Sequence, residues 1–387
     1  MPPDFLGYNS TMETAQLDHA RQKKAKEYSR ISRRLMLVDL TLTGLYALAW
    51  LLFGWSAALR DALAQVTSGP GSLLALFAAV FGGIYYLIEL PLSFYAGFVL
   101  PHRFGQSNQT LRGWISDQVK NILVLGVLGL FVLEMIYVVL RDFPDIWWIL
   151  AAVLLLLSTL VGSILAPVLL MPIFYKFKPL GEEHAGLAER LTRLSERAGT
   201  RVKGVYKFDM STRTKAANAA LTGLGSTRRI ILGDTLLSEF SDDEIETVLA
   251  HELGHHVNRD IPLLIAFQTL TTVGGLFLAS LALRWGVGQF GFQGVGDPAA
   301  LPLFMLVMGL FGLVTMPLSN AVSRWREVLA DRYALQSTRK PEAFASAMTR
   351  IANQNLAEVD PEPWVEFLLY SHPALEKRIG MAREYVS

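Results

Sequence analysis

The sequence of 387 residues contains no cysteine and few charged residues. Without cysteine the chain can form no disulfide bond and no thiolate metal site, so any metal must be bound by histidine and carboxylate side chains. Only 18% of the residues are charged, whereas 52% are hydrophobic and the mean hydropathy is +0.34. This composition is too apolar for an ordinary soluble enzyme and indicates that most of the chain lies in a membrane.

The chain also lacks a strongly basic domain, and its net charge is +1. We therefore expect no nucleic-acid partner. The first residues contain no short apolar core followed by a small-residue cleavage site, so they are not expected to act as a signal peptide. Instead, residues 1–34 are expected to form a polar N-terminal arm, rich in Lys and Arg, before the first apolar segment.

Six apolar segments are long enough to cross a bilayer, about 20 residues each or more. They cover approximately residues 35–59, 73–100, 119–140, 147–170, 261–283 and 301–322. Lys and Arg are more frequent in the N-terminal arm and the loop at 102–112 than in the loops of the opposite side, so the positive-inside rule places the former in the cytoplasm. Counting spans then places the polar segment after the fourth and the tail after the sixth in the cytoplasm as well.

The sequence therefore predicts a mainly α-helical, polytopic membrane protein with a small α+β insertion. Its expected parts are the arm (1–34), a four-helix membrane region (35–171), a cytoplasmic α+β protease insertion (172–260), two further membrane helices (261–322) and a C-terminal helical tail (323–387). Within the insertion, the patterns favour a helix at 182–197, a strand at 202–208 and a hairpin of 216–224 with 229–232. An extended peptide could add to an edge of such a sheet.

The clearest chemical signal is the sequence H-E-L-G-H at residues 251–255. Ser241 begins a capping box and apolar residues then recur at helical spacing, so a helix is predicted to start there. His251 and His255 would lie on one face of it and could bind one metal ion. Glu252 could take a proton from a metal-bound water, which is the arrangement of zinc metallopeptidases. The alternative is an exposed helix with two surface histidines.

A third metal ligand is expected from an acidic residue near the membrane face. Glu327 and Asp331, four residues apart just after the last span, would share a helix face. One carboxylate could bind the metal while the other accepts a hydrogen bond from a ligand histidine. The alternative is a solvated helix face that pairs with nearby arginines. His256 and Asp260, also four residues apart, are rival ligands, but His256 is rotated by about 100° from His255 and is not expected to join the site. A set of two histidines and one carboxylate favours one zinc ion per chain.

Beyond these local patterns, the chain resembles the type I CAAX prenyl proteases, which are integral-membrane zinc metalloendopeptidases. The resemblance rests on matching order and spacing of Asn218-Ala219 with Gly223, the segments 229–232 and 234–237, H-E-L-G-H, the segment 327–331, and Ser371-His372-Pro373 with Arg378-Ile379. A weaker similarity at 104–111 extends it into the N-terminal half. The resemblance implies a ring of helices around a large, water-filled chamber that the protease domain caps.

The resemblance also implies roles for individual residues. Zinc would be bound by His251, His255 and Glu327; Glu252 would be the base, Asp331 a supporting acid and His372 a donor to the oxyanion; Asn218, Ala219 and Arg378 would bind the substrate. Eukaryotic members have an additional first span and an aromatic residue where this chain has Ala220, and they often carry Trp at the position of His256.

The expected function is thus a multi-pass zinc endopeptidase of the bacterial inner membrane with its active site facing the cytoplasm. Its substrates would be CAAX-type or other lipidated or membrane-associated peptides, possibly prenylated. A quality-control protease without prenyl specificity and, less readily, a non-catalytic membrane scaffold are the alternatives. The presence of Glu252 argues against the scaffold, because a relic site has little use for a base.

Overall fold

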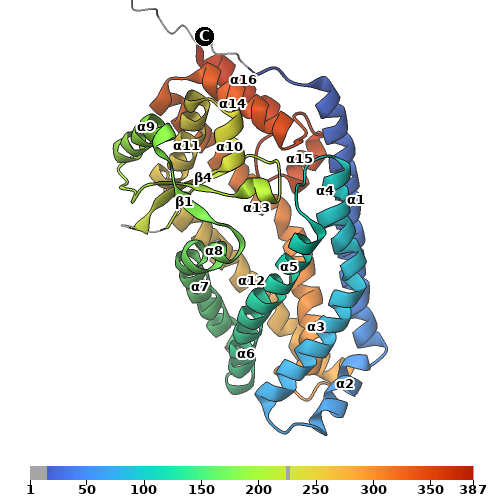
Figure 1. The fold of residues 1–387 in the computed structure, drawn as a ribbon. Helices are drawn as coiled ribbons and strands as arrows, with labels where there is room; N and C mark the ends of the chain where they lie inside the picture. Colours follow the sequence, from blue (N-terminus) through green and yellow to red (C-terminus); the bar gives the residue numbers. More distant parts are fainter. Residues whose placement is uncertain (1–14, 224–226, 387) are drawn as a thin grey trace, which may run out of the picture.

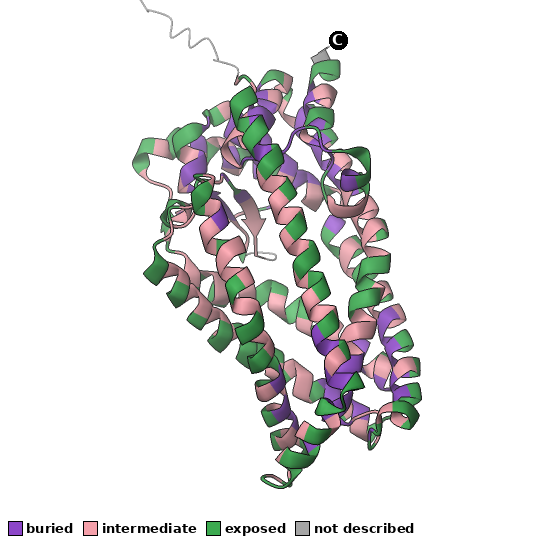
Figure 2. Cartoon of the chain, turned by 90° about the vertical axis from the view of Figure 1, so that its right-hand side faces the viewer, coloured by how far each residue is buried: buried purple, intermediate pink, exposed green. Residues whose placement is uncertain are grey.

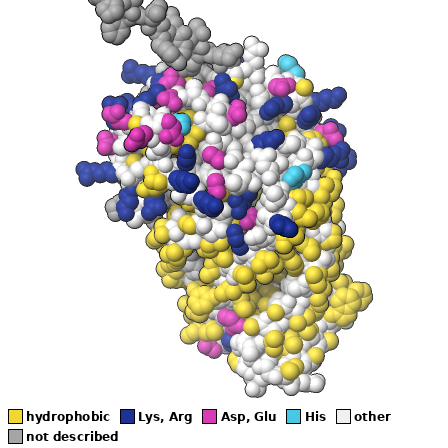
Figure 3. All heavy atoms as spheres, in the orientation of Figure 1, with side chains coloured by type: hydrophobic (Ala, Val, Ile, Leu, Met, Phe, Trp, Pro, Cys, Tyr) yellow, Lys and Arg dark blue, Asp and Glu magenta, His cyan; other side chains and the backbone are white. Residues whose placement is uncertain are grey.

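The computed structural model describes residues 15–223 and 227–386, which form a cap above a set of long helices (Figure 1). Six helical segments of this described part are long and apolar enough to cross a membrane, which confirms the six predicted segments. They are His19–Leu52, Pro70–Arg103, Leu111–Asp142, Trp147–Phe174, Asp260–Phe290 and Pro298–Thr338. Figure 3 shows charged side chains gathered on the cap and a largely hydrophobic surface around the long helices. The protein is therefore an integral, multi-pass membrane protein.

The membrane segments consist of several helices in sequence order. They are α1 (His19–Leu52), α3 (Pro70–Phe94), α4 (Leu100–Arg103), α5 (Leu111–Asn121), α6 (Val127–Asp142), α7 (Trp147–Leu165), α8 (Met171–Phe174), α12 (Asp260–Phe290) and α13 (Leu301–Thr338), with single π-helical turns between α3 and α4, α5 and α6, and α7 and α8. A short helix, α2 (Trp55–Ala64), lies between α1 and α3.

The boundaries at the N-terminal end differ from the prediction. Asp18 caps α1, so the expected separate arm is, from residue 19 onward, the first half of a membrane helix, while residues 1–14 lie outside the described part. This polar half packs on the cap, where Gln22 Nε2 donates to the carbonyl of Ala357 at 3.1 Å. The predicted span 35–59 is interrupted after α1, because Gly54 adopts φ 70° and turns the chain into α2.

One further predicted boundary, between the last span and the tail, is also displaced. The helix α13 continues without a break from the last membrane span to Thr338, so the tail does not begin as a separate unit at residue 323. Its sequence contains no helix-breaking residue after Pro317, which explains the continuity. As a result, the predicted third ligand lies on the same rigid element as the last span.

Buried residues gather at the two ends of the molecule (Figure 2). We call the connected set of buried apolar residues within 187–253 and 334–382 the cap core, and the connected set within 46–152 and 276–303 the far-end cluster. Only 11–28% of the most apolar part of each span is buried inside the protein. Most of the apolar surface of the spans therefore faces lipid or the space between helices. A water-filled chamber among them remains a prediction.

The cap contains a four-stranded mixed sheet with the order β1-β2-β4-β3. Its strands are β1 (Phe177–Pro179), β2 (Val205–Phe208), β3 (Ala219–Thr222) and β4 (Arg229–Gly233). The pair β3–β4 is antiparallel, which confirms the predicted hairpin, whereas β2 and β4 are parallel. The strand β1 was not predicted, because it has only three residues and is separated from the end of α8 by two residues. The order of the strands leaves β3 at one edge of the sheet.

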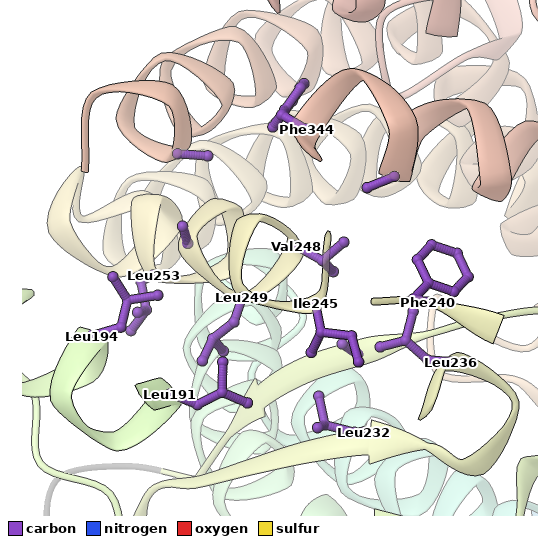
Figure 4. Packing of buried hydrophobic residues seen from close by; sticks show 14 of the residues in the cluster. Leu191, Leu194, Leu232, Leu236, Phe240, Ile245, Val248, Leu249, Leu253 and Phe344 are labelled. Carbon is purple, nitrogen blue, oxygen red and sulfur yellow. The ribbon is translucent and has the colours of Figure 1, made fainter. Parts of the chain in front are cut away.

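Helices cover one face of the sheet and complete the cap. They are α9 (Ala185–Arg197), α10 (Asp234–Glu239), α11 (Asp242–Val257), α14 (Pro341–Gln354), α15 (Pro363–Leu369) and α16 (Leu375–Val386). Figure 4 shows the apolar face of α11, with Leu249 and Leu253, packed against Leu191 of α9 and Leu232 of β4. Each such leucine contributes about 1.5–3 kcal/mol through removal from water. This packing fixes the rotation of α11 and hence the direction of its polar face.

Candidate active site

The helix α11 begins as the sequence predicts. The Ser241 side chain accepts a hydrogen bond from the backbone N–H of Glu244, and the backbone N–H of Ser241 donates to Glu244 Oε2 at 2.8 Å. Both halves of the capping box are therefore present. Because the start of the helix is fixed in this way and its apolar face is buried in the cap core, the two histidines of the motif project together toward α13.

Two histidines of α11 and one carboxylate of α13 form the centre of the site. Nε2 of His251 lies 3.3 Å from Glu327 Oε2, and Nε2 of His255 lies 3.4 Å from Glu327 Oε1. The candidate ligand atoms of the three residues lie within 4.8 Å of one another. Ligand atoms about 2.0–2.1 Å from a tetrahedral zinc ion are separated by roughly 3.3 Å, so the spacing fits this metal.

Two observations on these side chains support a bound cation. Glu327 Oε2 is buried and accepts no hydrogen bond from any described residue. A buried carboxylate oxygen without a partner is costly, and a metal ion would satisfy it. In addition, burial alone would lower the pKa of His251, yet the neighbouring carboxylates of Asp331 and Glu327 raise it to about 9. Surroundings that favour a proton on this ring also favour a metal cation in its place.

Each ligand histidine is held from behind by a buried aspartate. Nδ1 of His251 lies 2.8 Å from Asp331 Oδ1, and Nδ1 of His255 lies 2.7 Å from Asp260 Oδ2. Asp331, the expected supporting acid, thus lies against the ring of His251. Asp260 was considered from the sequence only as a rival ligand. A signal was present, since a carboxylate follows the second histidine by five residues at the start of the next apolar segment.

Two arginines neutralise these aspartates. Nε of Arg378 donates to Asp331 Oδ2 at 2.8 Å, and the Arg326 guanidinium donates to Asp260. Arg378 is buried, with 8% of its surface exposed, and its donors are directed at the aspartate. The structure therefore places this residue, expected to contact substrate, behind the site instead. Arg326 is absent from the sequence-based expectations.

Two other polar side chains face the metal-binding centre. Glu252 follows His251 on α11, and burial raises the pKa of its carboxyl group, an effect that the neighbouring histidines partly offset. A raised pKa suits a group that must accept and then release a proton near neutral pH. Nε2 of His372 lies 3.3 Å from Glu327 Oε1, although the residues are 45 positions apart in the sequence. Its side chain is 59% exposed and can therefore reach a bound molecule.

The sheet edge lies beside this centre, since β3 packs against α11. Asn218 directly precedes β3, and its carbonyl accepts a hydrogen bond from the backbone N–H of Gly233 at 2.9 Å. Ala219 is the first residue of the strand and pairs with Leu232 of β4. The outer edge of β3 pairs with no other described strand. Backbone groups on that edge can bind an extended peptide.

His256 lies away from the centre, in agreement with its predicted orientation. Its Nε2 accepts a hydrogen bond from Arg228 Nη1 at 3.2 Å. The candidate metal-binding group found among the described residues contains His251, His255 and Glu327 without it.

Comparisons with known proteins agree with the geometry of the site. Residues 182–386 match peptidase family M48, and residues 11–176 match the N-terminal region of CAAX prenyl proteases, described as five membrane helices. The described part of that second range contains four candidate spans. The uncharacterized metalloprotease YhfN of Bacillus subtilis is 28% identical over 93% of this chain and 85% of its own length.

Two further relatives support the same assignment. CAAX prenyl protease 1 of Saccharomyces cerevisiae is 32% identical over 80% of this chain and 72% of its own length. The crystal structure of S. mikatae Ste24p is similar with a TM-score of 0.85 and 26% identity, and the match covers 95% of this chain and 90% of that one. The chain therefore belongs to peptidase family M48, whose members are zinc metallopeptidases that hydrolyse peptide bonds, and it carries the N-terminal membrane region of the CAAX prenyl proteases.

Proposed function

We propose that this protein is a membrane-embedded endopeptidase that binds one zinc ion through His251, His255 and Glu327 and cleaves extended peptides at the sheet edge. The observation that carries the proposal is the placement of His251, Glu252 and His255 on α11, which packs against β3 and brings the two histidines to Glu327 of α13. When bound, zinc would supply a Lewis acid that polarises the scissile carbonyl and lowers the pKa of the attacking water.

The residues of the chain supply the remaining chemistry. Glu252 accepts the proton of the attacking water and then donates it to the leaving amine. His372, close to the metal-binding group and largely exposed, donates a hydrogen bond to the oxygen on which charge develops. The side chain of Asn218 and backbone groups of Ala219 align the peptide along β3 so that one carbonyl faces the metal. Asp331 keeps His251 in the required orientation.

The proposed substrates are CAAX-type or other lipidated or membrane-associated peptides. Two facts support them: the chain carries the membrane region of CAAX prenyl proteases, and one relative is itself named CAAX prenyl protease 1. A zinc site at the end of six apolar spans also suits a substrate that is partly held in the membrane. A quality-control protease that ignores the prenyl group would have the same site and is the second candidate.

Matched peptides distinguish these two candidates. The purified full-length protein in detergent is incubated with one peptide in prenylated and unprenylated form, with and without a chelator, and the products are identified by mass spectrometry. We expect cleavage of the prenylated peptide that the chelator abolishes. Equal cleavage of both forms would favour the quality-control protease, and chelator-resistant cleavage or none at all would contradict a zinc peptidase.

We further propose that the cap and both termini face the cytoplasm of a bacterial cell, because the polar ends of the chain are richer in Lys and Arg. The absence of native cysteine permits a clean test. A membrane-impermeant maleimide added to intact cells should label Asp145→Cys, whose native side chain is 87% exposed at the opposite end, but not Arg193→Cys on the cap. Labelling of Arg193→Cys but not of Asp145→Cys would show that the protein has the opposite orientation in the membrane.

A further inference from the structure

The second ligand histidine is held by a pair of buried residues, Asp260 and Arg326. Asp260 lies at the start of α12 with 1% of its surface exposed, and Arg326 lies on α13 with 6% exposed. We infer that Asp260 is a positioning residue for His255 and that Arg326 fixes Asp260 in place. This inference rests on the zinc site of the proposed function and adds two residues that support it.

The aspartate determines which ring nitrogen of the histidine is free. A carboxylate oxygen accepts hydrogen bonds, so Asp260 Oδ2, 2.7 Å from Nδ1 of His255, requires the proton on Nδ1. The lone pair is then on Nε2, the atom that faces Glu327 at 3.4 Å. Without this acceptor the ring could exchange tautomers or rotate, and only a fraction of molecules would present the correct nitrogen to the metal.

The guanidinium of Arg326 compensates the buried negative charge of Asp260. A carboxylate with 1% exposure requires a compensating charge, and the guanidinium of Arg326 donates to the oxygen of Asp260 that does not face His255. Its Nη2 also donates to the carbonyl of Asn258 at 2.7 Å. One guanidinium thus binds both the side chain behind the ligand and the backbone that leads to it.

The second of these bonds stabilises an unusual corner of the backbone. Between α11 and α12, Arg259 adopts φ 55°, in the left-handed region that is unfavourable for a residue with a side chain. This corner allows Asp260, five residues after His255, to turn back beneath its ring. The bond from Arg326 to the carbonyl next to the corner keeps α12 at this angle.

The position of Arg326 also joins the second ligand to the third. It precedes Glu327 on α13, so the same turn presents the metal-binding carboxylate and the cation behind His255. Asp331, one turn further on α13, supports His251 in the same manner. All three ligands therefore depend on the position of α13, two of them through an aspartate.

The test measures metal binding, independently of peptide cleavage. Full-length Asp260→Asn protein in detergent is compared with wild type in zinc affinity, by chelator competition, and in the visible spectrum of the Co²⁺-loaded protein, which reports ligand geometry. We expect the affinity for zinc to fall about 10- to 100-fold and the Co²⁺ spectrum to change. Unchanged affinity and spectrum would overturn the inference.

A matched control separates positioning from general destabilisation. Asp297, with 5% exposure, is paired with Arg60 at the far end of the membrane helices, so Asp297→Asn also removes a buried paired carboxylate. We expect this variant to keep the zinc affinity and Co²⁺ spectrum of wild type even where its melting temperature falls. An equal loss of zinc affinity in this control would show that the effect is general and would overturn the inference.

A second variant covers the case in which Asp260→Asn does not fold. The double variant Asp260→Asn/Arg326→Met leaves no unpaired buried charge and is expected to fold with the same weakened zinc affinity. Wild-type affinity in the double variant would overturn the inference. If the wild-type protein binds zinc but cleaves no peptide, the proposed function fails while the expected loss of affinity in Asp260→Asn remains measurable.

Discussion

The cap core and the far-end cluster lie at opposite ends of the same long helices, yet they differ in what is buried with them. Beside the cap core lie paired charges that have little exposed surface, among them Asp331 with 0% and Arg378 with 8%. Beside the far-end cluster, the buried charged residues in the described part of the chain are Arg60 and Asp297. The rest of that cluster is apolar and aromatic.

This difference follows from what each region must hold. Buried ion pairs cost much of their Coulomb energy in desolvation, so in the cap they are better explained by the orientation that they impose on His251 and His255 than by stability. At the far end no such orientation is needed, and ring packing such as that of Trp50 on Phe81, with centroids 5.2 Å apart, joins the helices. The comparison indicates that chemistry and helix assembly are separated along the molecule.

The largest effect is expected for a substitution of Glu252, and it tests whether residues of the cap carry out the catalysis. In Glu252→Gln the carboxamide cannot accept a proton near neutral pH, so turnover should fall by several orders of magnitude while zinc stays bound. Zinc content and peptide cleavage are measured on the same purified sample. Near-normal turnover in this variant would overturn the mechanism, and loss of zinc would identify Glu252 as a ligand instead.

The second prediction compares the same substitution in the two clusters. Leu249 of the cap core and Leu74 of the far-end cluster are both fully buried, so replacing either with Ala should cost about 2–5 kcal/mol of stability. Only Leu249→Ala should also weaken zinc binding, because Leu249 lies on the helix that carries the histidines. Thermal denaturation in detergent and chelator competition give the two values. An equal loss of zinc affinity in Leu74→Ala would abolish the proposed separation.

The features that could be predicted from the sequence have local causes. The six spans follow from continuous hydropathy, and the metal-binding histidines from a spacing of four residues on one helix. A capping box at Ser241 fixed the start of that helix because its two partners are three residues apart. The family resemblance added His372, which no local pattern would have joined to the site.

The features that escaped prediction depend on tertiary contacts or on single dihedral angles. Asp260 and Arg326 are 66 residues apart, and their pairing exists only because α12 and α13 pack together. The polar residues in the first half of α1 are predicted from sequence to form a separate arm, because their partners, such as Ala357, lie more than 300 residues away in the sequence. The end of α1 depends on the positive φ of Gly54, which hydropathy does not report.

A third prediction concerns the close packing of α11 against α13 at Gly254. A Cβ added to Gly254 of α11 would lie 2.8 Å from Cα of Ala330 on α13, so Gly254→Ala must push the two helices apart. We expect a loss of about 1–3 kcal/mol in stability together with weaker zinc binding, since Glu327 is on the displaced helix. Gly312→Ala, also on α13 but with nothing within 4 Å of the added Cβ, should lower neither quantity, because alanine favours a helix more than glycine does. Equal behaviour of the two variants would show that the contact is not limiting.

The smallest expected effect concerns an ion-pair cluster on the surface of the cap. Asp243, near the start of α11, accepts hydrogen bonds from Arg190 of α9 and from Lys340 Nζ at 2.6 Å, before α14. Burial alone would raise the pKa of Asp243, but these two cations lower it below its ordinary value of 3.8. A carboxyl group whose pKa is lower in the folded state stabilises the protein above its unfolded pKa and loses that contribution as the pH falls through its folded pKa.

The substitution Asp243→Asn therefore has an effect that depends on pH in a defined direction. The amide resembles the protonated acid, so the stability difference from wild type should be about 1 kcal/mol at pH 7, between the values for exposed ion pairs and for buried charged hydrogen bonds. It should shrink as the pH falls below about 4 and disappear once Asp243 is protonated in both states. Melting temperatures of the metal-free proteins, recorded in chelator between pH 7 and pH 3, measure this difference without a contribution from zinc release.

Asp242→Asn is the matched control. Asp242 occupies the same helix end, but its side chain is 54% exposed and lies 3.8 Å from Arg190. The effect of this substitution on stability should therefore be smaller at every pH. A difference for Asp243→Asn that does not shrink as the pH falls from 4 to 3 would show that shape rather than charge at this position joins α9 and α14 to α11.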